Sequence, residues 1–236
     1  MSDAEPVPLL LVGATGLIGS AVIEATATAD VQLAALARRE IAMPAGARLE
    51  MLVADPAQWP AAIVRARPAT LAIALGTTIK AVGGDARAFR AVDHDLVIAC
   101  ARAAREAGAR QAILVSSAGA DAASRNFYLS VKGETEAAIN KLGFARVDIL
   151  RPGMLIGPRT GPSRPAERAG QILSPLIDLF LRGSLARYRS VPARAVAAAI
   201  LALAGAEGRG RHVHYPADIH SLSRRVLTLK ATYRAP

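Results

Sequence analysis

The most informative stretch of the chain reads Val7-Pro-Leu-Leu-Leu-Val-Gly13-Ala-Thr-Gly16-Leu-Ile-Gly19. An apolar run ends here at three glycines spaced Gly-x-x-Gly-x-x-Gly, and a helical pattern follows. Strand, glycine turn and helix in this order are typical of a dinucleotide-binding turn. Gly13 would permit a tight exit from the strand, Gly16 would let backbone N–H groups approach a diphosphate, and Gly19 would let the helix lie close to the sheet. We therefore predict cofactor contacts for Gly13, Thr15, Gly16, Leu17, Ile18 and Gly19.

The size and composition of the chain predict one domain. Its 236 residues, 52% of them hydrophobic, suffice for one sizeable core. We expect residues 1–236 to form one unit in which residues 153–220 contribute the substrate side. The single cysteine, Cys100, cannot form an internal disulfide. Because the first residues also lack the pattern of a secretory signal, we expect a cytoplasmic protein.

The chain is basic without an obvious polyanion-binding motif. Its formal net charge is +10, but the arginines are dispersed along the sequence and only 4% of residues are aromatic. Few aromatic rings leave little for stacking on bases, so we expect no specific nucleic-acid partner. The longest strongly apolar helical stretch, residues 195–206, is shorter than the ~20 residues that span a bilayer, so we expect no membrane span.

Short apolar runs alternate with helix-like segments along the chain. The predicted strands are 7–12, 31–36, 48–53, 70–75, 111–116, 145–150 and 211–215. The predicted helices are 17–28, 57–66, 86–107, 131–142, 166–182 and 192–205. This alternation predicts an α/β fold with a doubly wound, mostly parallel sheet of about seven strands. We expect a loop over a site at 157–170 and a loose tail at 221–236.

The ends of the second, third and fourth strands carry candidate cofactor contacts. Arg38 and Arg39 stand where an NAD-binding chain usually carries an acidic residue for the ribose 2′-hydroxyl. Two arginines suit a 2′-phosphate, which favours NADP(H) over NAD(H), although they could also be an exposed pair that ends a strand. Asp55 could accept from the adenine amino group or cap the next helix. After the fourth strand, Gly76, Thr77 and Thr78 could lie along the cofactor or form a simple turn.

Candidate catalytic residues follow the fifth strand. Ser116 and Ser117 lie at its end, and Tyr128 and Lys132 are four residues apart, on one face of a helix. A tyrosine side chain has an ordinary pKa of about 10, so it exchanges protons near neutral pH only with help from a neighbouring cation. We expect Lys132 to supply that cation while Ser117 holds the substrate oxygen. The spacing alone leaves open which serine faces the substrate.

Five blocks of sequence, in order, resemble the short-chain dehydrogenase/reductase superfamily. The resemblance is to its atypical branch, which contains the Tat-interacting-protein-like oxidoreductases. It covers roughly residues 7–220 and rests on GATGLIG at 13–19, LGTT at 75–78, VSSAGAD at 115–121, NFYLSVKGE at 126–134 and LRPGMLIGPR at 150–159. It implies a seven-stranded Rossmann sheet with an NADP-binding cleft. The resemblance also implies Ser117, Tyr128 and Lys132 as the catalytic set, cofactor contacts from Ser116, Tyr128 and Lys132, and Arg151, Pro152 and Gly153 beside the nicotinamide.

The chain departs from that family at two places. Many relatives carry an asparagine on the long fourth helix that relays protons to the lysine, whereas this chain has Val92-Asp93-His94-Asp95. The part that follows Pro152 is short, which argues against a large sugar-nucleotide pocket. We expect an NADP-dependent oxidoreductase for a small or apolar carbonyl/alcohol pair. The alternative is an NADP(H)-binding regulatory or assembly protein with little catalysis.

Other polar residues carry weaker hypotheses. His212, His214, Asp218 and His220 lack the pattern of a metal site, so we predict no metal. Cys100 lies in an alanine-rich helical segment and is expected to be a small core residue. The partner that we expect is a small-molecule substrate. The pattern leaves open whether the chain is a monomer or a homodimer.

Overall fold

A seven-stranded parallel sheet forms the centre of the protein. The computed structural model describes residues 8–27, 31–41, 43–45, 47, 49–157 and 181–233. The strands are β1 Leu9–Val12, β2 Leu33–Ala37, β3 Leu49–Val53, β4 Thr70–Ile73, β5 Gln111–Val115, β6 Arg146–Leu150 and β9 Gly210–His214. Their order is β3-β2-β1-β4-β5-β6-β9, and every pairing is parallel. The predicted α/β doubly wound fold is confirmed, and the winding direction reverses between β1 and β4, where ligands of such sheets bind.

The central strands form because their side chains are buried on both faces. Every residue of β1, β2, β4 and β5 is buried. Leu9 pairs with Leu33 on one side and with Thr70 on the other, so β1 lies inside the sheet. Fully burying one leucine or isoleucine side chain contributes about 1.5–3 kcal/mol, which explains why short apolar runs suffice for strands.

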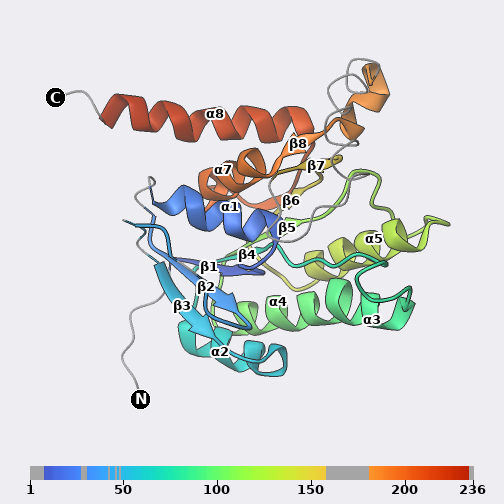
Figure 1. The fold of residues 1–236 in the computed structure, drawn as a ribbon, viewed down its shortest axis with the longest axis horizontal. Helices are drawn as coiled ribbons and strands as arrows, with labels where there is room; N and C mark the ends of the chain where they lie inside the picture. Colours follow the sequence, from blue (N-terminus) through green and yellow to red (C-terminus); the bar gives the residue numbers. More distant parts are fainter. Residues whose placement is uncertain are drawn as a thin grey trace.

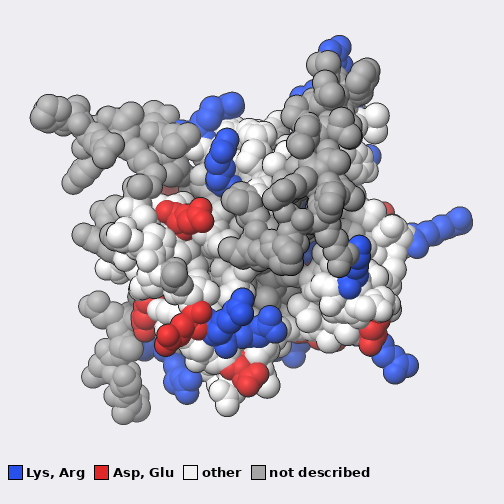
Figure 2. Space-filling view, viewed as in Figure 1, with Lys and Arg blue, Asp and Glu red and all other residues white. Residues whose placement is uncertain are grey.

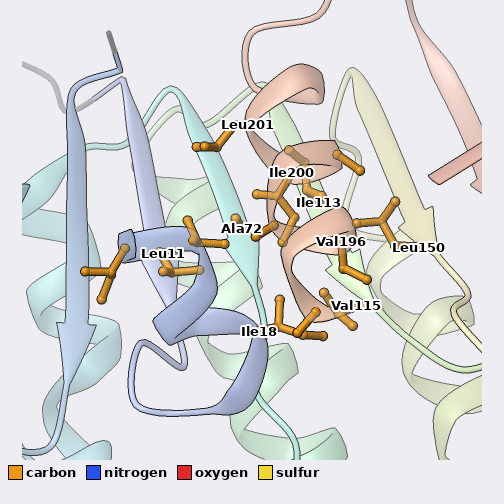
Figure 3. Packing of buried hydrophobic residues seen from close by; sticks show 14 of the residues in the cluster. Leu11, Ile18, Ala72, Ile113, Val115, Leu150, Val196, Ile200 and Leu201 are labelled. Carbon is orange, nitrogen blue, oxygen red and sulfur yellow. The ribbon is translucent and has the colours of Figure 1, made fainter. Parts of the chain in front are cut away.

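Helices cover both faces of the sheet (Figure 1). One face carries α1 Leu17–Thr26 and α7 Ala193–Leu203, and the other carries α2 Trp59–Ala66, α4 Val97–Glu106 and α5 Phe127–Asn140. The short 3₁₀ turn η1, Pro56–Gln58, precedes α2. Ile18 of α1 and Val196 and Ile200 of α7 form one buried cluster with Ala72 and Ile113 of the sheet (Figure 3). This layer fixes α1, and with it the glycine turn, against the strands.

The predicted helix 86–107 consists of three parts. The helix α3, Ala86–Arg90, begins at Asp85, whose Oδ1 accepts hydrogen bonds from the N–H groups of Arg87 and Ala88 at 2.7 and 3.2 Å. A π-helical segment, η2, follows at Ala91–Leu96, and α4 then continues. Single π-helical turns often occur at functional sites.

The carboxyl-terminal part differs from the prediction. A helix, α8 Pro216–Tyr233, stands where residues 221–236 were expected to be loose, so that expectation is wrong up to residue 233. The helix packs on α7, on the side away from the sheet (Figure 1), where Ile219 is fully buried. Packing of a few apolar side chains can stabilise a helix whose sequence is mostly polar. A small parallel sheet, β7 Leu155–Ile156 with β8 Val191–Pro192, and the 3₁₀ segment η3 Gly183–Tyr188 were not predicted.

Two predicted elements lie in the part of the chain that the structure does not describe. The loop expected at 157–170 and the helix expected at 166–182 fall almost entirely outside the described residues. Among the described helices, none combines the length and the apolar character that crossing a bilayer requires.

Candidate active site

The three glycines of the turn have three different surroundings. Gly13 has a φ of +95°, and a Cβ there would lie 2.7 Å from the backbone of Ala74. A Cβ on Gly19 would collide with the Gly13 carbonyl oxygen, so α1 can lie this close to the turn only with glycine. Gly16 has an ordinary extended φ of −79°, and the atom nearest to its imagined Cβ is 3.4 Å away. Neither the backbone conformation nor packing against the described residues requires glycine at 16.

The turn leaves backbone donors at the start of α1. Gly16 is the N-cap and has no side chain to cap the helix, so the first-turn N–H groups of Leu17, Ile18 and Gly19 have no partner within the helix. Thr15 and Gly16 are exposed, whereas the side chain of Ile18 is buried in the core. Any cofactor contact of Ile18 would therefore come from its backbone. Donors at a helix N-terminus favour an anion.

Arg38, Arg39 and Asp55 lie at the ends of neighbouring strands. Arg38 and Arg39 follow β2, are exposed, and make no hydrogen bond or ion pair with any residue that the structure describes. Basic side chains gather on the face where β2 ends (Figure 2). Asp55 follows β3 at the N-cap position of η1, but its side chain makes no capping hydrogen bond. All three side chains are thus free to meet a ligand.

A buried ion pair lies beyond the end of β4. Lys132 Nζ is 2.7 Å from Asp93 Oδ1, and the two side chains are 8% and 0% exposed. The other Asp93 oxygen accepts a hydrogen bond from the Thr77 N–H at 2.7 Å. A Cβ on Gly76 would lie 3.8 Å from Lys132 Nζ, so the lysine ends beside the backbone of this exit. Thr78 is exposed, and its hydroxyl accepts from the Ala81 N–H at 3.0 Å.

The π-helical segment η2 positions Asp93. The Thr135 hydroxyl on α5 donates to the Asp93 carbonyl oxygen at 3.1 Å and to the Val131 carbonyl oxygen at 2.7 Å. Asp93 is thereby held through its backbone and its side chain against one face of α5. Sequence reasoning recognised Asp93 only as a departure from the family pattern, because its pairing with Lys132 spans 39 residues of chain and depends on η2.

The two serines after β5 have different surroundings. The Ser116 hydroxyl is buried and donates to Glu136 Oε1 at 2.6 Å. The Ser117 hydroxyl is half-buried, and its contact with a described residue is a long one, 3.4 Å to the Ala118 carbonyl oxygen. Of the two hydroxyls, that of Ser117 is the more available to a substrate.

Tyr128 lies in the first turn of α5, one turn before Lys132. The predicted helix started at 131, but Asn126 caps it earlier by accepting from the Leu129 N–H at 3.1 Å. The half-buried Tyr128 ring packs on Phe89, with 5.8 Å between ring centres. Its hydroxyl has no hydrogen bond to any described residue.

Glu136 organises a second polar cluster that sequence reasoning missed. Arg151 donates to both Glu136 oxygens, at 2.9 and 2.6 Å, and Arg211 donates to one of them at 3.1 Å. The hydrogen bonds and charge of Glu136 outweigh partial burial and raise the pKa of Arg151. Arg151 also donates to the Tyr215 hydroxyl at 3.2 Å. The one available signal was the spacing of Glu136, four residues after Lys132 on the same helix.

Arg151, Pro152 and Gly153 each have a different neighbour in the structure. The Arg151 guanidinium, expected beside the nicotinamide, is committed to Glu136. The Pro152 carbonyl accepts from the Ala118 N–H at 2.8 Å, next to Ser117. A Cβ on Gly153 would collide with the carbonyl oxygens of Tyr188 and Arg189, so glycine allows this loop to lie against η3.

His214, in β9, belongs to a structural network around Asp148. His214 Nε2 is 2.9 Å from Asp148 Oδ1, and Arg146 and Gln111 donate to the same buried carboxylate. Burial alone would raise the pKa of Asp148, but hydrogen bonds from His214, Arg146 and Gln111 outweigh it and lower the pKa to about 2. Among the described residues, no group of three possible ligands could hold a metal ion. Burial raises the pKa of the Cys100 thiol to about 12, so it is a core residue, as predicted.

Solved structures with this fold include sugar-nucleotide enzymes. The Thermus thermophilus UDP-glucose 4-epimerase, solved with NAD, has 19% identity and a TM-score of 0.63 over 97% of this chain and 84% of that one. The Campylobacter jejuni UDP-Glc/GlcNAc 4-epimerase has 13% identity and a TM-score of 0.67 over 90% and 81%. At these identities the likeness shows the fold alone.

Curated relatives correct the expected location. The chain is 37% identical to the Aspergillus fumigatus protein fmp52, mitochondrial, over 83% of its own length and 88% of the relative. It is 36% identical to the Saccharomyces cerevisiae protein FMP52, mitochondrial, over 78% and 80%. The expectation of a cytoplasmic protein is contradicted, because these relatives are named as mitochondrial.

The family comparison agrees with the glycine turn and the sheet. A family model described as NAD(P)H-binding matches residues 13–206. The match begins at the first glycine of the turn and ends after α7, so it includes every predicted catalytic and cofactor-binding residue, from Gly13 to Gly153. The chain belongs to this NAD(P)H-binding family, together with the fungal FMP52 proteins.

Proposed function

We propose that the protein is an NADP(H)-dependent oxidoreductase of the short-chain dehydrogenase/reductase type, in the atypical branch that contains the Tat-interacting-protein-like enzymes. Its substrate would be a small or apolar carbonyl/alcohol pair. The observation that carries the proposal is the buried Lys132–Asp93 pair beside Gly76 and Thr77. Burying a lysine is costly unless it is paired, so this placement at the ligand-binding edge of the sheet suggests a role beyond packing.

The glycine turn and the strand ends fit the cofactor. The open face at Gly16 would admit a diphosphate, and the first-turn N–H groups of α1 would donate to it. Arg38 and Arg39 would hold a 2′-phosphate, which supports NADP(H) over NAD(H). When bound, this cofactor supplies or accepts the hydride.

The residues of α5 and β5 would handle the proton and the substrate oxygen. The free hydroxyl of Tyr128 would donate its proton to the carbonyl oxygen during reduction and take it back during oxidation. Ser117 would donate a hydrogen bond to the same oxygen. Asp93 would hold the Lys132 ammonium in place one turn away from Tyr128.

One observation favours the alternative, an NADP(H)-binding regulatory or assembly protein. The Lys132 charge is already paired with Asp93, which reduces the support that it can give to a phenolate. Under this alternative the protein binds NADPH and turns over no carbonyl compound.

Tyr128→Phe separates the two functions. We expect wild type to consume NADPH with at least one member of a carbonyl panel, and Tyr128→Phe to lose this turnover while its NADPH affinity stays within about twofold, because the ring packing on Phe89 is retained. Lys132→Ala should weaken both turnover and NADPH binding. The matched control is Lys141→Ala, which removes an exposed lysine at the end of the same helix. Tight NADPH binding without turnover, or turnover undiminished in Tyr128→Phe, would favour the regulatory function.

A further inference from the structure

A cavity lies beside α5, next to Glu136. It has a volume of about 630 Å³ and is bounded by α5, the loop after β5, the ends of β6 and β9, and η3. We call it the arginine pocket and define it by six of its lining residues: Glu136, Arg151, Arg187, Tyr188, Arg211 and Tyr215. The glycine turn and the buried Lys132–Asp93 pair are not part of this lining.

The three guanidinium groups of the pocket differ in how many hydrogen bonds and ion pairs they make with described residues. Arg151 is committed to both oxygens of Glu136 and to the Tyr215 hydroxyl. Among the described residues, Arg211 makes one hydrogen bond, 3.1 Å long, to that same carboxylate, and its side chain is 42% exposed. Arg187 stacks on the Tyr188 ring, 5.1 Å from its centre, and has no carboxylate partner among the described residues.

The acidic residues of the lining do not balance the positive charge of its three arginines. Glu136 is shared by Arg151 and Arg211, so one carboxylate serves two cations. Asp121, the other acidic residue of the lining, is exposed, and its Oδ1 accepts from the backbone N–H of Ala123 at 2.9 Å. The pocket therefore keeps unused guanidinium donors, chiefly on Arg187 and Arg211.

The tyrosine rings that line the pocket suit a ligand with a planar or apolar part. The Tyr188 ring lies over Gly119, where a Cβ would be 3.4 Å from the ring, and the Tyr215 ring faces the Arg151 guanidinium at 5.9 Å. Small residues, Gly119, Ala120 and Ala137, complete this part of the lining. Tyrosine rings beside arginines can bind a molecule that has both a planar part and an anionic group.

We propose that the arginine pocket binds a small organic anion, a phosphate monoester or a carboxylate with an aromatic or apolar body. Arg187 and Arg211 hold the anionic group, and Tyr188 and Tyr215 contact the body. Arg151 and Glu136 keep the pocket in shape. This site is separate from the dinucleotide turn, so it does not depend on the function proposed above.

The test uses isothermal titration calorimetry on the full chain. The probes are phenyl phosphate and benzoate, which carry the two kinds of anion, and phenol, which has the ring without the charge. Titrations are repeated with saturating NADPH, because a phosphate could also bind near Arg38 and Arg39. The NADPH affinity is measured separately, so failure of the proposed function is distinguishable from failure of this proposal.

We expect one molecule of phenyl phosphate or benzoate to bind per chain, with and without NADPH, and phenol not to bind. Whichever of the two anions binds more tightly shows whether the pocket prefers a phosphate monoester or a carboxylate. Arg187→Gln/Arg211→Gln should weaken binding at least tenfold, and the single change Arg187→Gln, at an exposed side chain that has no ion pair with a described residue, should weaken it severalfold without altering the unfolding temperature. Arg209→Gln, an exposed arginine outside the pocket, is the matched control and should bind within twofold of wild type.

Three results would overturn the proposal. One is the absence of binding by either anion. Another is equal weakening by Arg209→Gln, which would indicate general attraction to a chain of net charge +10. The third is competition by NADPH together with full affinity in the Arg187→Gln/Arg211→Gln variant, which would place the anion at the dinucleotide turn.

Discussion

Replacing Asp93 by asparagine tests the buried ion pair most directly. Asparagine keeps the shape of the side chain and can still accept from the Thr77 N–H, but it leaves the Lys132 ammonium buried without a counter-charge. Removing one partner of a buried pair costs about 3–5 kcal/mol. In a chain of this length that loss lowers the unfolding temperature by about 6–20 °C, at ~2–4 °C per kcal/mol.

The assay is reversible unfolding in denaturant, followed by circular dichroism, on a double-mutant cycle with Lys132→Met. Removing both charges should restore stability, so the double variant should be at least about 2 kcal/mol more stable than the sum of the two single effects predicts. The matched control is Asp95→Asn, two residues further along η2, where the carboxylate is 62% exposed and paired with His94. That change should cost no more than about 0.5 kcal/mol. A coupling energy near zero, or equal effects at 93 and 95, would refute a stabilising buried pair.

Three further outcomes follow from the structure. Gly16→Val should abolish NADPH binding in calorimetry with little loss of stability. Gly19→Ala should lower stability as well, because its Cβ collides with the turn backbone. Normal NADPH binding by Gly16→Val would mean that the turn is only structural. Arg38→Ala/Arg39→Ala should remove a preference for NADPH over NADH of tenfold or more, worth at least ~1.4 kcal/mol, without affecting the fold; equal affinities in wild type would contradict the role of these arginines. Because the pKa of Asp148 is lowered from 3.8 to about 2, its carboxylate stabilises the fold above pH 4 and loses roughly 2 kcal/mol of that contribution as the pH falls from 4 to about 2. Unfolding free energies measured between pH 5 and 2 should therefore fall more steeply in wild type than in Asp148→Asn, and equal slopes would count against the network.

Local signals were sufficient to predict the sheet. The strands are short runs buried on both faces, and each predicted run overlaps an observed strand, with ends that differ by two residues or fewer. The glycine spacing likewise predicted the tight turn at Gly13 and the close helix at Gly19, and both follow from backbone geometry. The sequence signals for these features each lie within one short stretch of the chain.

Features that depend on distant residues were not predictable in the same way. The helical pattern of 86–107 does not reveal the π-helical segment, and the Lys132–Asp93 pair depends on it. Glu136 meets Ser116, Arg151 and Arg211 across 20, 15 and 75 positions, so its role appears only when the strand ends come together. Helix α8 was missed because its stability comes from packing on α7 rather than from its own composition.

The π-helical segment η2 also bears on how related chains are aligned. A π turn is an α-helix that has accepted one additional residue, and each residue of an α-helix rotates the next by about 100°. In this chain η2 joins α3 directly to α4, with no loop between them. A homologue with an uninterrupted helix should be one residue shorter at this point, and the alignment gap should fall between Ala91 and Leu96. An aspartate that aligns with Asp93 in such a chain would face a different direction from the one seen here.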